Sequence, residues 1–194
     1  MGTGVRGASA LGGRLRTVLV VVVTVVAIGL VAFVIDQPTA SGVTNLKLSG
    51  AVAGAPPQVG QVPPDFTAMT ADGKTVRLSD LKGKPVWLNF GATWCQDCRS
   101  EVPDVEAAWQ KYQGQGLVLV AVYQDDAASA ADYVRRVGIT YRMAVDADTA
   151  IASRYDILGI PTHVFIGRDG TVKAFRIGGL KPDDIDRYVQ DVLR

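Results

Sequence analysis

The chain contains two cysteines, Cys95 and Cys98, and only two residues separate them. An apolar run at 86–90 comes before them, and the segment 95–113 has the pattern of a helix. A disulfide between them would close a very small loop. By reducing the entropy of the unfolded chain, it would stabilise the fold by only about 2 kcal/mol. The pair is therefore a poor brace for a fold, and its place at the start of a helix indicates chemistry.

Segments on either side of the cysteines alternate between strand and helix. Two of the strands are almost continuously apolar, as expected of strands buried on both faces, and Asp72-Gly73 and Asp169-Gly170 each indicate a hairpin. Strands are predicted at 65–69, 75–78, 86–90, 117–122, 143–145, 163–166 and 171–175, and helices at 95–113, 127–137, 150–155 and 182–193. This order predicts an α/β domain with a mixed central sheet flanked by helices and an N-terminal β-hairpin.

Cys95 falls at the N-terminus of the expected helix. Unpaired backbone N–H groups and the helix dipole favour an anion there, and such positions lower the pKa of cysteine thiols, whose thiolate is the reactive form. Cys98 lies on the same helical face and can attack a mixed disulfide formed at Cys95. The two residues are therefore expected to act as nucleophile and resolving thiol.

An uncharged block of 19 residues, 17–35, lies near the N-terminus. As a helix it would be about 28 Å long, enough to cross a bilayer. Basic residues precede the block and the first acidic residue, Asp36, follows it, so 1–16 is predicted to be cytoplasmic and the rest extracytoplasmic. The basic residues are Arg6, Arg14 and Arg16. We predict a single-pass signal-anchor at 17–35 in the cell membrane; a signal peptide cleaved near 38–42 is the alternative.

The segment 36–62 is rich in Gly, Ala, Pro, Ser and Thr, which predicts a flexible linker to a folded domain at 63–194. After the three N-terminal arginines, the chain has 17 basic and 19 acidic side chains. This near neutrality argues against nucleic-acid binding. An extracytoplasmic compartment would permit disulfides.

Several motifs resemble a known family. Trp94-Cys95-x-x-Cys98, Pro103 five residues further on and Gly-Ile-Pro-Thr at 159–162 resemble thioredoxin. The runs 89–95 and 99–103, with the expected anchor, are similar to the TlpA-like group of membrane-anchored thioredoxins, which includes the ResA and CcmG reductants of cytochrome c maturation. The resemblance covers nearly all of 63–194 and implies a thioredoxin-like fold.

The resemblance also implies roles for residues of the loop at 159–162. It implies that the Ile160–Pro161 bond is cis, that this loop lies against the cysteines, and that Pro161 belongs to the catalytic set. The backbone of Ile160 is expected to pair with an incoming substrate, and Trp94 and Thr162 are the other expected substrate contacts.

The helix after the cysteines carries two further residues of interest. Glu101 occupies the position of a functional carboxylate in the TlpA-like group, so its possible roles are a proton relay or a solvated helix carboxylate. Pro103 is expected to kink the helix or to end it.

Three positions depart from the thioredoxin pattern. Asn89 stands where cytoplasmic thioredoxins carry a buried Asp. Asp97, between the cysteines, either opposes thiolate formation, which would make the pair a better reductant, or points into water. Gly91, where the family often has an aromatic residue, is expected to leave space beside the site.

Metal binding, peroxidase chemistry and a scaffold role are the other functions that a cysteine pair could serve. With His163, the only histidine, they would suit Cu(I), but copper chaperones of the Sco type have three residues between their cysteines. His163 is more simply interpreted as a packed strand residue. Structural zinc needs four ligands, and a peroxiredoxin would carry Pro and Thr or Ser where Leu88 and Ala92 stand. A scaffold without redox turnover would not need both cysteines.

These features predict an extracytoplasmic thiol:disulfide oxidoreductase with a redox-active disulfide Cys95–Cys98, no metal and no organic cofactor. Its expected partners are extracytoplasmic protein thiols and disulfides, apocytochrome c among them, and a membrane thiol donor. We favour a reductant. An oxidant that introduces disulfides into secreted proteins is the alternative. The direction of electron transfer depends on the reduction potential of the cysteine pair, and a difference of about 30 mV corresponds to about 1.4 kcal/mol.

Overall fold

The computed structural model describes residues 19–24 and 56–194. The predicted cytoplasmic segment 1–16, most of the predicted anchor and the linker up to residue 55 lie outside these ranges. Residues 19–24 are helical. No helix in the two described ranges is both long and apolar enough to cross a membrane, so the anchor at 17–35 stays a prediction.

Five strands form the central sheet, in the spatial order β5-β4-β3-β6-β7. Strands β3, β4 and β5 run parallel, and β6 and β7 are antiparallel to their neighbours, so the sheet is mixed, as predicted. The strands are β3 (Val86–Gly91), β4 (Val118–Tyr123), β5 (Arg142–Val145), β6 (Thr162–Ile166) and β7 (Val172–Ile177). Strand β3 lies at the centre with β6 beside it, and every residue in both is buried.

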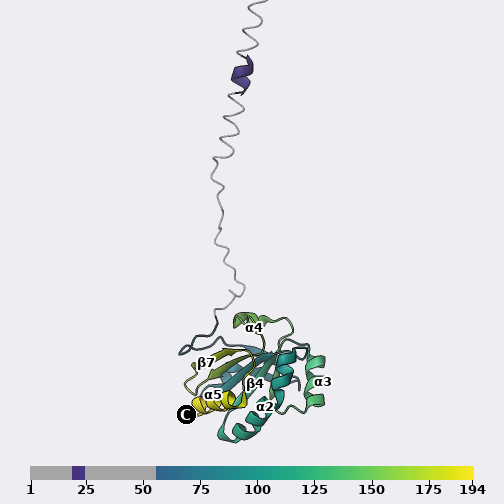
Figure 1. Cartoon of the computed structure of the whole chain (residues 1–194), viewed down its shortest axis with the longest axis vertical. Coiled ribbons are helices and arrows are strands. Elements are labelled where there is room, and N and C mark those ends of the chain that lie inside the picture. The colour runs from purple at the N-terminus through teal and green to yellow at the C-terminus, as the bar shows by residue number, and fades with distance from the viewer. Residues whose placement is uncertain (1–18, 25–55) are drawn as a thin grey trace, which may run out of the picture. The chain divides into compact units, whose positions relative to one another are not determined.

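Helices cover both faces of this sheet (Figure 1). They are α2 (Gln96–Tyr112), α3 (Ala127–Val137), α4 (Ala150–Arg154) and α5 (Pro182–Leu193), with short 3₁₀ turns at Leu78–Leu81 and Gln113–Gln115. Helix α2 continues through Pro103, so the alternative that the helix ends there is wrong, and the kink stays a prediction. Helices α3 and α5 have the predicted bounds.

Alternation of side chains along the strands divides the apolar residues into two cores. One core joins α2, α3 and α5 to Trp87, Leu119 and Phe165. The other joins α4 and the N-terminal hairpin to Leu88, Phe90 and other residues of the opposite face. Residues of β3 therefore alternate between the two cores, and odd-numbered residues of β3, including Asn89, face α2.

The predicted hairpin is present as a separate two-stranded sheet of β1 (Thr67–Met69) and β2 (Thr75–Arg77). Gly73 has a φ of 80° in its turn, a conformation that favours glycine. The packed chain begins before the predicted boundary at residue 63. Gly60 N–H donates to Val172 O at 2.8 Å, and Val172 N–H donates to Gln61 O at 2.9 Å. Backbone hydrogen bonds do not require particular side chains, so no sequence pattern indicated that the packed chain begins before residue 63.

Candidate active site at the cysteine pair

The loop that carries Cys95 is held in place by a residue after β4. Asp125 is buried, and its carboxylate accepts hydrogen bonds from the Thr93 N–H at 2.8 Å and the Thr93 hydroxyl at 2.6 Å. Sequence reasoning missed Asp125, because it lies 32 residues from Thr93 and nothing local connects them. These bonds fix the start of α2.

Cys95 is the N-cap residue of α2 and is joined to Cys98 by a disulfide, with the Cα atoms 5.3 Å apart. The Cys98 N–H donates to Cys95 Sγ at 3.1 Å. A helix N-terminus therefore points a donor at this sulfur, as the sequence predicted. Cys95 is 8% exposed and Cys98 is 3% exposed. Cys95 is thus the more accessible of the two, although both are largely enclosed.

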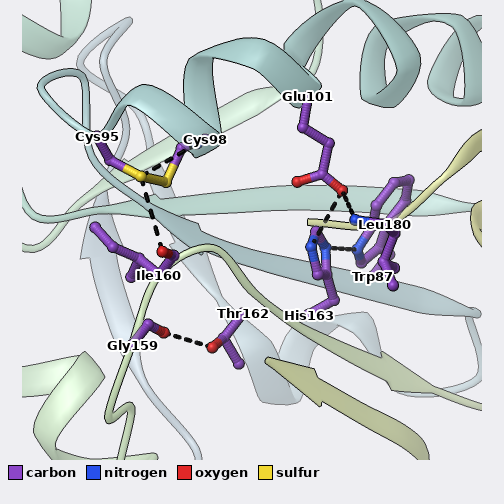
Figure 2. Close-up of polar contacts among 9 residues, drawn as sticks. All are labelled: Trp87, Cys95, Cys98, Glu101, Gly159, Ile160, Thr162, His163 and Leu180. Carbon is purple, nitrogen blue, oxygen red and sulfur yellow. Dashed lines mark hydrogen bonds and ion pairs between the residues drawn. A yellow bond between two sulfur atoms is a disulfide. The ribbon is translucent and has the colours of Figure 1, made fainter. Parts of the chain in front are cut away.

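The loop at 159–162 lies against Cys95, and its Ile160–Pro161 bond is cis, as the resemblance implied. Ile160 O lies 3.9 Å from Cys95 Sγ (Figure 2). The Gly178 N–H donates to Pro161 O at 2.8 Å. Thr162 is fully buried and its hydroxyl donates to Gly159 O at 2.6 Å. The Thr162 side chain therefore supports the loop from inside, and a contact of Thr162 with substrate stays a prediction.

Exposed apolar side chains lie close to Cys95 or to the loop at 159–162. Trp94, next to Cys95, is 66% exposed, and Leu158, two residues before Ile160, is 80% exposed. Ile177, opposite Thr162 on β7, is 58% exposed. Of these, the sequence singled out Trp94 but not Leu158 or Ile177. Apolar side chains beside a reactive sulfur can bind the apolar residues of an incoming chain.

Glu101, one turn after Cys98, is buried, so the interpretation as a solvated helix carboxylate is wrong. Its Oε1 accepts a hydrogen bond from the Leu180 N–H at 2.9 Å. His163 Nε2 lies 3.2 Å from the same oxygen. Glu101 Oε2 is also buried but has no hydrogen-bond partner, and it points toward the side on which the cysteines lie (Figure 2).

His163 is fully buried on β6 and packs beneath α2. Its Nδ1 accepts a hydrogen bond from Trp87 Nε1–H at 3.2 Å. The interpretation of His163 as an ordinary packed residue missed its link to Glu101. The available signal was weak, because only the register of β6 against β3 places His163 on the same face as Trp87.

The three departures from the thioredoxin pattern have different outcomes. Asn89 is buried opposite His163, and its Oδ1 has no partner. Asp97 is exposed, so it points into water. A Cβ at Gly91 would come within 2.8 Å of the Tyr123 ring, so Tyr123 already fills the space that Gly91 was expected to leave.

Metal binding finds little support in this arrangement. The residues that the structure describes contain no group of three or more His, Cys, Asp or Glu side chains that could hold an ion. One ring nitrogen of His163 is bonded to Trp87 and the other faces Glu101. His163 is therefore a poor third ligand for Cu(I).

Comparisons with known proteins agree with the geometry. Residues 59–175 match the AhpC/TSA family. Thiol-disulfide oxidoreductase ResA of Bacillus cereus is 32% identical over 136 residues, which are 70% of this chain and 79% of that protein. ResA of Bacillus subtilis is 32% identical over 127 residues, 65% of this chain and 71% of that protein. The crystal structure of a thioredoxin family thiol:disulfide interchange protein from Chlorobium tepidum matches with a TM-score of 0.63 and 31% identity, covering 73% of this chain and 100% of that one.

Proposed function

We propose that this protein reduces disulfide bonds of other proteins outside the cytoplasm. The premise is that the chain belongs to the AhpC/TSA family and is a thiol:disulfide oxidoreductase. The observation that carries the exchange chemistry is the buried carboxylate of Glu101, whose free oxygen points toward the cysteine pair. The direction of transfer and the location are proposed from the family resemblance and from the block 17–35. A proton acceptor behind the second cysteine is what that cysteine needs to complete an exchange.

The reaction begins with the reduced pair. Cys95, as thiolate beside the Cys98 N–H, attacks one sulfur of a substrate disulfide. A bond forms between Cys95 and that sulfur, the substrate S–S bond breaks, and the other substrate sulfur leaves as a thiolate that takes a proton from water. The result is a mixed disulfide at Cys95.

Cys98 completes the reaction. Its thiol gives its proton to Glu101 Oε2, and its sulfur attacks Cys95 Sγ. The Cys95–Cys98 disulfide forms, the mixed disulfide breaks, and the second substrate thiolate leaves and is protonated. Two electrons have passed from the pair to the substrate, and the oxidised pair of this structure is the product. A thiol donor must then reduce it again.

The surface around Cys95 favours a protein substrate in an extended conformation. The Ile160 backbone lies beside the sulfur, where it can bind the backbone of an incoming chain. Trp94, Leu158 and Ile177 can take apolar residues that flank the target cysteine. An unfolded protein such as apocytochrome c meets both conditions, and it is the substrate that the resemblance to the TlpA-like group implies.

The extracytoplasmic location is part of the proposal. It is supported by the uncharged block 17–35 and by the basic residues before it. Protease added to spheroplasts should degrade the domain and spare a short N-terminal fragment. Recovery of a freely soluble domain that begins near residue 41 would indicate a cleaved signal peptide.

The reduction potential of the Cys95–Cys98 pair tests the direction of transfer. We expect a value near that of thioredoxin, about −270 mV, measured by equilibration with glutathione or dithiothreitol buffers. A value near about −120 mV, which is typical of a strong oxidant, would instead support the introduction of disulfides into secreted proteins.

A further inference from the structure

The ring of His163 is fixed by its neighbours. The Trp87 indole nitrogen can only donate, so His163 Nδ1 must be the acceptor of their 3.2 Å hydrogen bond. The proton of the neutral ring therefore sits on Nε2. The ring also lies beside that of Phe165, with centroids 6.4 Å apart and an interplanar angle of 19°. All three side chains are fully buried.

The proton on His163 Nε2 faces Glu101. Nε2 lies 3.2 Å from Glu101 Oε1, although the N–H does not align as a full hydrogen bond, so the contact is mainly an electrostatic attraction. The Leu180 N–H donates to the same oxygen at 2.9 Å. Two donors from outside α2 therefore converge on Oε1 and set the rotation of the carboxylate (Figure 2).

The second carboxylate oxygen is left without a partner. Oε2 is buried and accepts no hydrogen bond, which costs free energy unless another group uses it. The two donors on Oε1 turn Oε2 toward the cysteine side.

From this geometry we propose that His163, held by Trp87, is a positioning residue that turns Glu101 Oε2 toward Cys98 for the resolving step. The inference rests on the proposed use of Glu101 as proton acceptor. It assigns a role to the contacts that link Trp87, His163 and Glu101, which lie on β3, β6 and α2. It requires that His163 affect the attack by Cys98 and not the attack by Cys95.

Ellman's reagent separates these two attacks without a protein substrate. When the reduced protein meets one equivalent of the reagent, attack by Cys95 releases a first coloured thiolate, and attack by Cys98 on the adduct releases a second. We expect His163→Leu to leave the first phase within about twofold of wild type. The second phase should slow by about tenfold, which is part of the roughly 10²–10⁴-fold that a well-positioned general base supplies.

Three further variants separate positioning from structural damage. His163→Gln retains an N–H donor and should recover part of the second-phase rate. Trp87→Phe should slow the second phase in the same direction and add little to His163→Leu. Val164→Ala is the matched control, because Val164 lies on the same buried strand but packs in the core on the opposite face of the sheet, and it should slow neither phase.

A double-mutant cycle decides whether His163 acts through Glu101. In a Glu101→Gln background, His163→Leu should have almost no further effect on the second phase. An equal slowing in both backgrounds would overturn the proposal, as would a wild-type second phase in His163→Leu. If His163→Leu does not fold, His163→Gln is compared in the same cycle. The assay with Ellman's reagent gives the same result whether the protein is a reductant or an oxidant in the cell. A reduction potential typical of an oxidant would therefore contradict the proposed function and leave this inference standing.

Discussion

The carbonyl oxygen of Ile160 lies 3.9 Å from the sulfur of Cys95, although 65 positions separate the two residues in the sequence. Ile160 also packs against the small cluster of Ala92, Cys95 and Cys98. The loop at 159–162 and the start of α2 therefore form one surface. A substrate that reaches the sulfur must contact this loop at the same time.

Trapping should distinguish the two cysteines. With Cys98→Ser, Cys95 can still attack a substrate disulfide but nothing expels the product, so mixed disulfides with native partners should accumulate on non-reducing gels. With Cys95→Ser, the remaining thiol is the less exposed one and few adducts should form. Equal trapping by both variants would contradict the assigned roles. Apocytochrome c among the adducts would support a reductant, and a broad set of secreted proteins would support an oxidant.

The apolar rim should matter for protein substrates only. Leu158→Ser and Ile177→Ser remove exposed apolar surface beside the site, so the KM for an unfolded protein disulfide should rise severalfold while reaction with Ellman's reagent is unchanged. Val137→Ser is the matched control, since Val137 is an exposed apolar residue at the end of α3. A rise in KM for the control as large as that for the rim variants would argue against this binding surface.

Asp125 should stabilise the loop before Cys95. Asp125→Ala leaves the Thr93 N–H without its partner, so the free energy of unfolding should fall by about 1–3 kcal/mol. Denaturant titration of the oxidised protein measures this loss. Asp132→Ala, which removes only exposed ion pairs with Arg135 and Arg136, should change the unfolding free energy by less than about 1 kcal/mol. Similar losses in the two variants would contradict the role of Asp125.

Buried tyrosines should make the protein sensitive to high pH. Burial raises the pKa of Tyr123, Tyr141 and Tyr155 above the ordinary value. Because the folded-state pKa is raised, the unfolded chain loses these protons first. Stability should therefore be complete below about pH 10 and fall as the pH rises beyond it. Unfolding free energies across this range, with tyrosinate absorbance, measure the effect.

Two variants test the origin of this alkaline loss. Tyr155→Phe removes the hydrogen bond to Pro64 O, at a cost of about 1 kcal/mol at neutral pH, but the decline above about pH 10 should become shallower. Tyr188 is the control, because a hydrogen bond from Arg176 lowers its pKa, so Tyr188→Phe should not make the decline shallower. An unchanged slope in Tyr155→Phe would contradict the prediction.

The sequence alone determined the elements of this fold and the reactive pair. Helices at Ala127–Val137 and Pro182–Leu193 have the predicted bounds, because apolar periodicity and capping residues are local signals. Cys95 at a helix N-terminus follows from the same local pattern. The mixed sheet followed from the order of the elements, and the cis bond before Pro161 from the family resemblance.

Only the tertiary structure decided which side chains support the cysteines. Asp125 beneath Thr93, the burial of Glu101 and the contact between Glu101 and His163 join separate elements. Each depends on strand register and on how α2 lies across the sheet. A shift of one residue in the pairing of β6 with β3 would turn His163 to the other face. Such contacts are set by packing between distant segments, and no pattern within one segment encodes them.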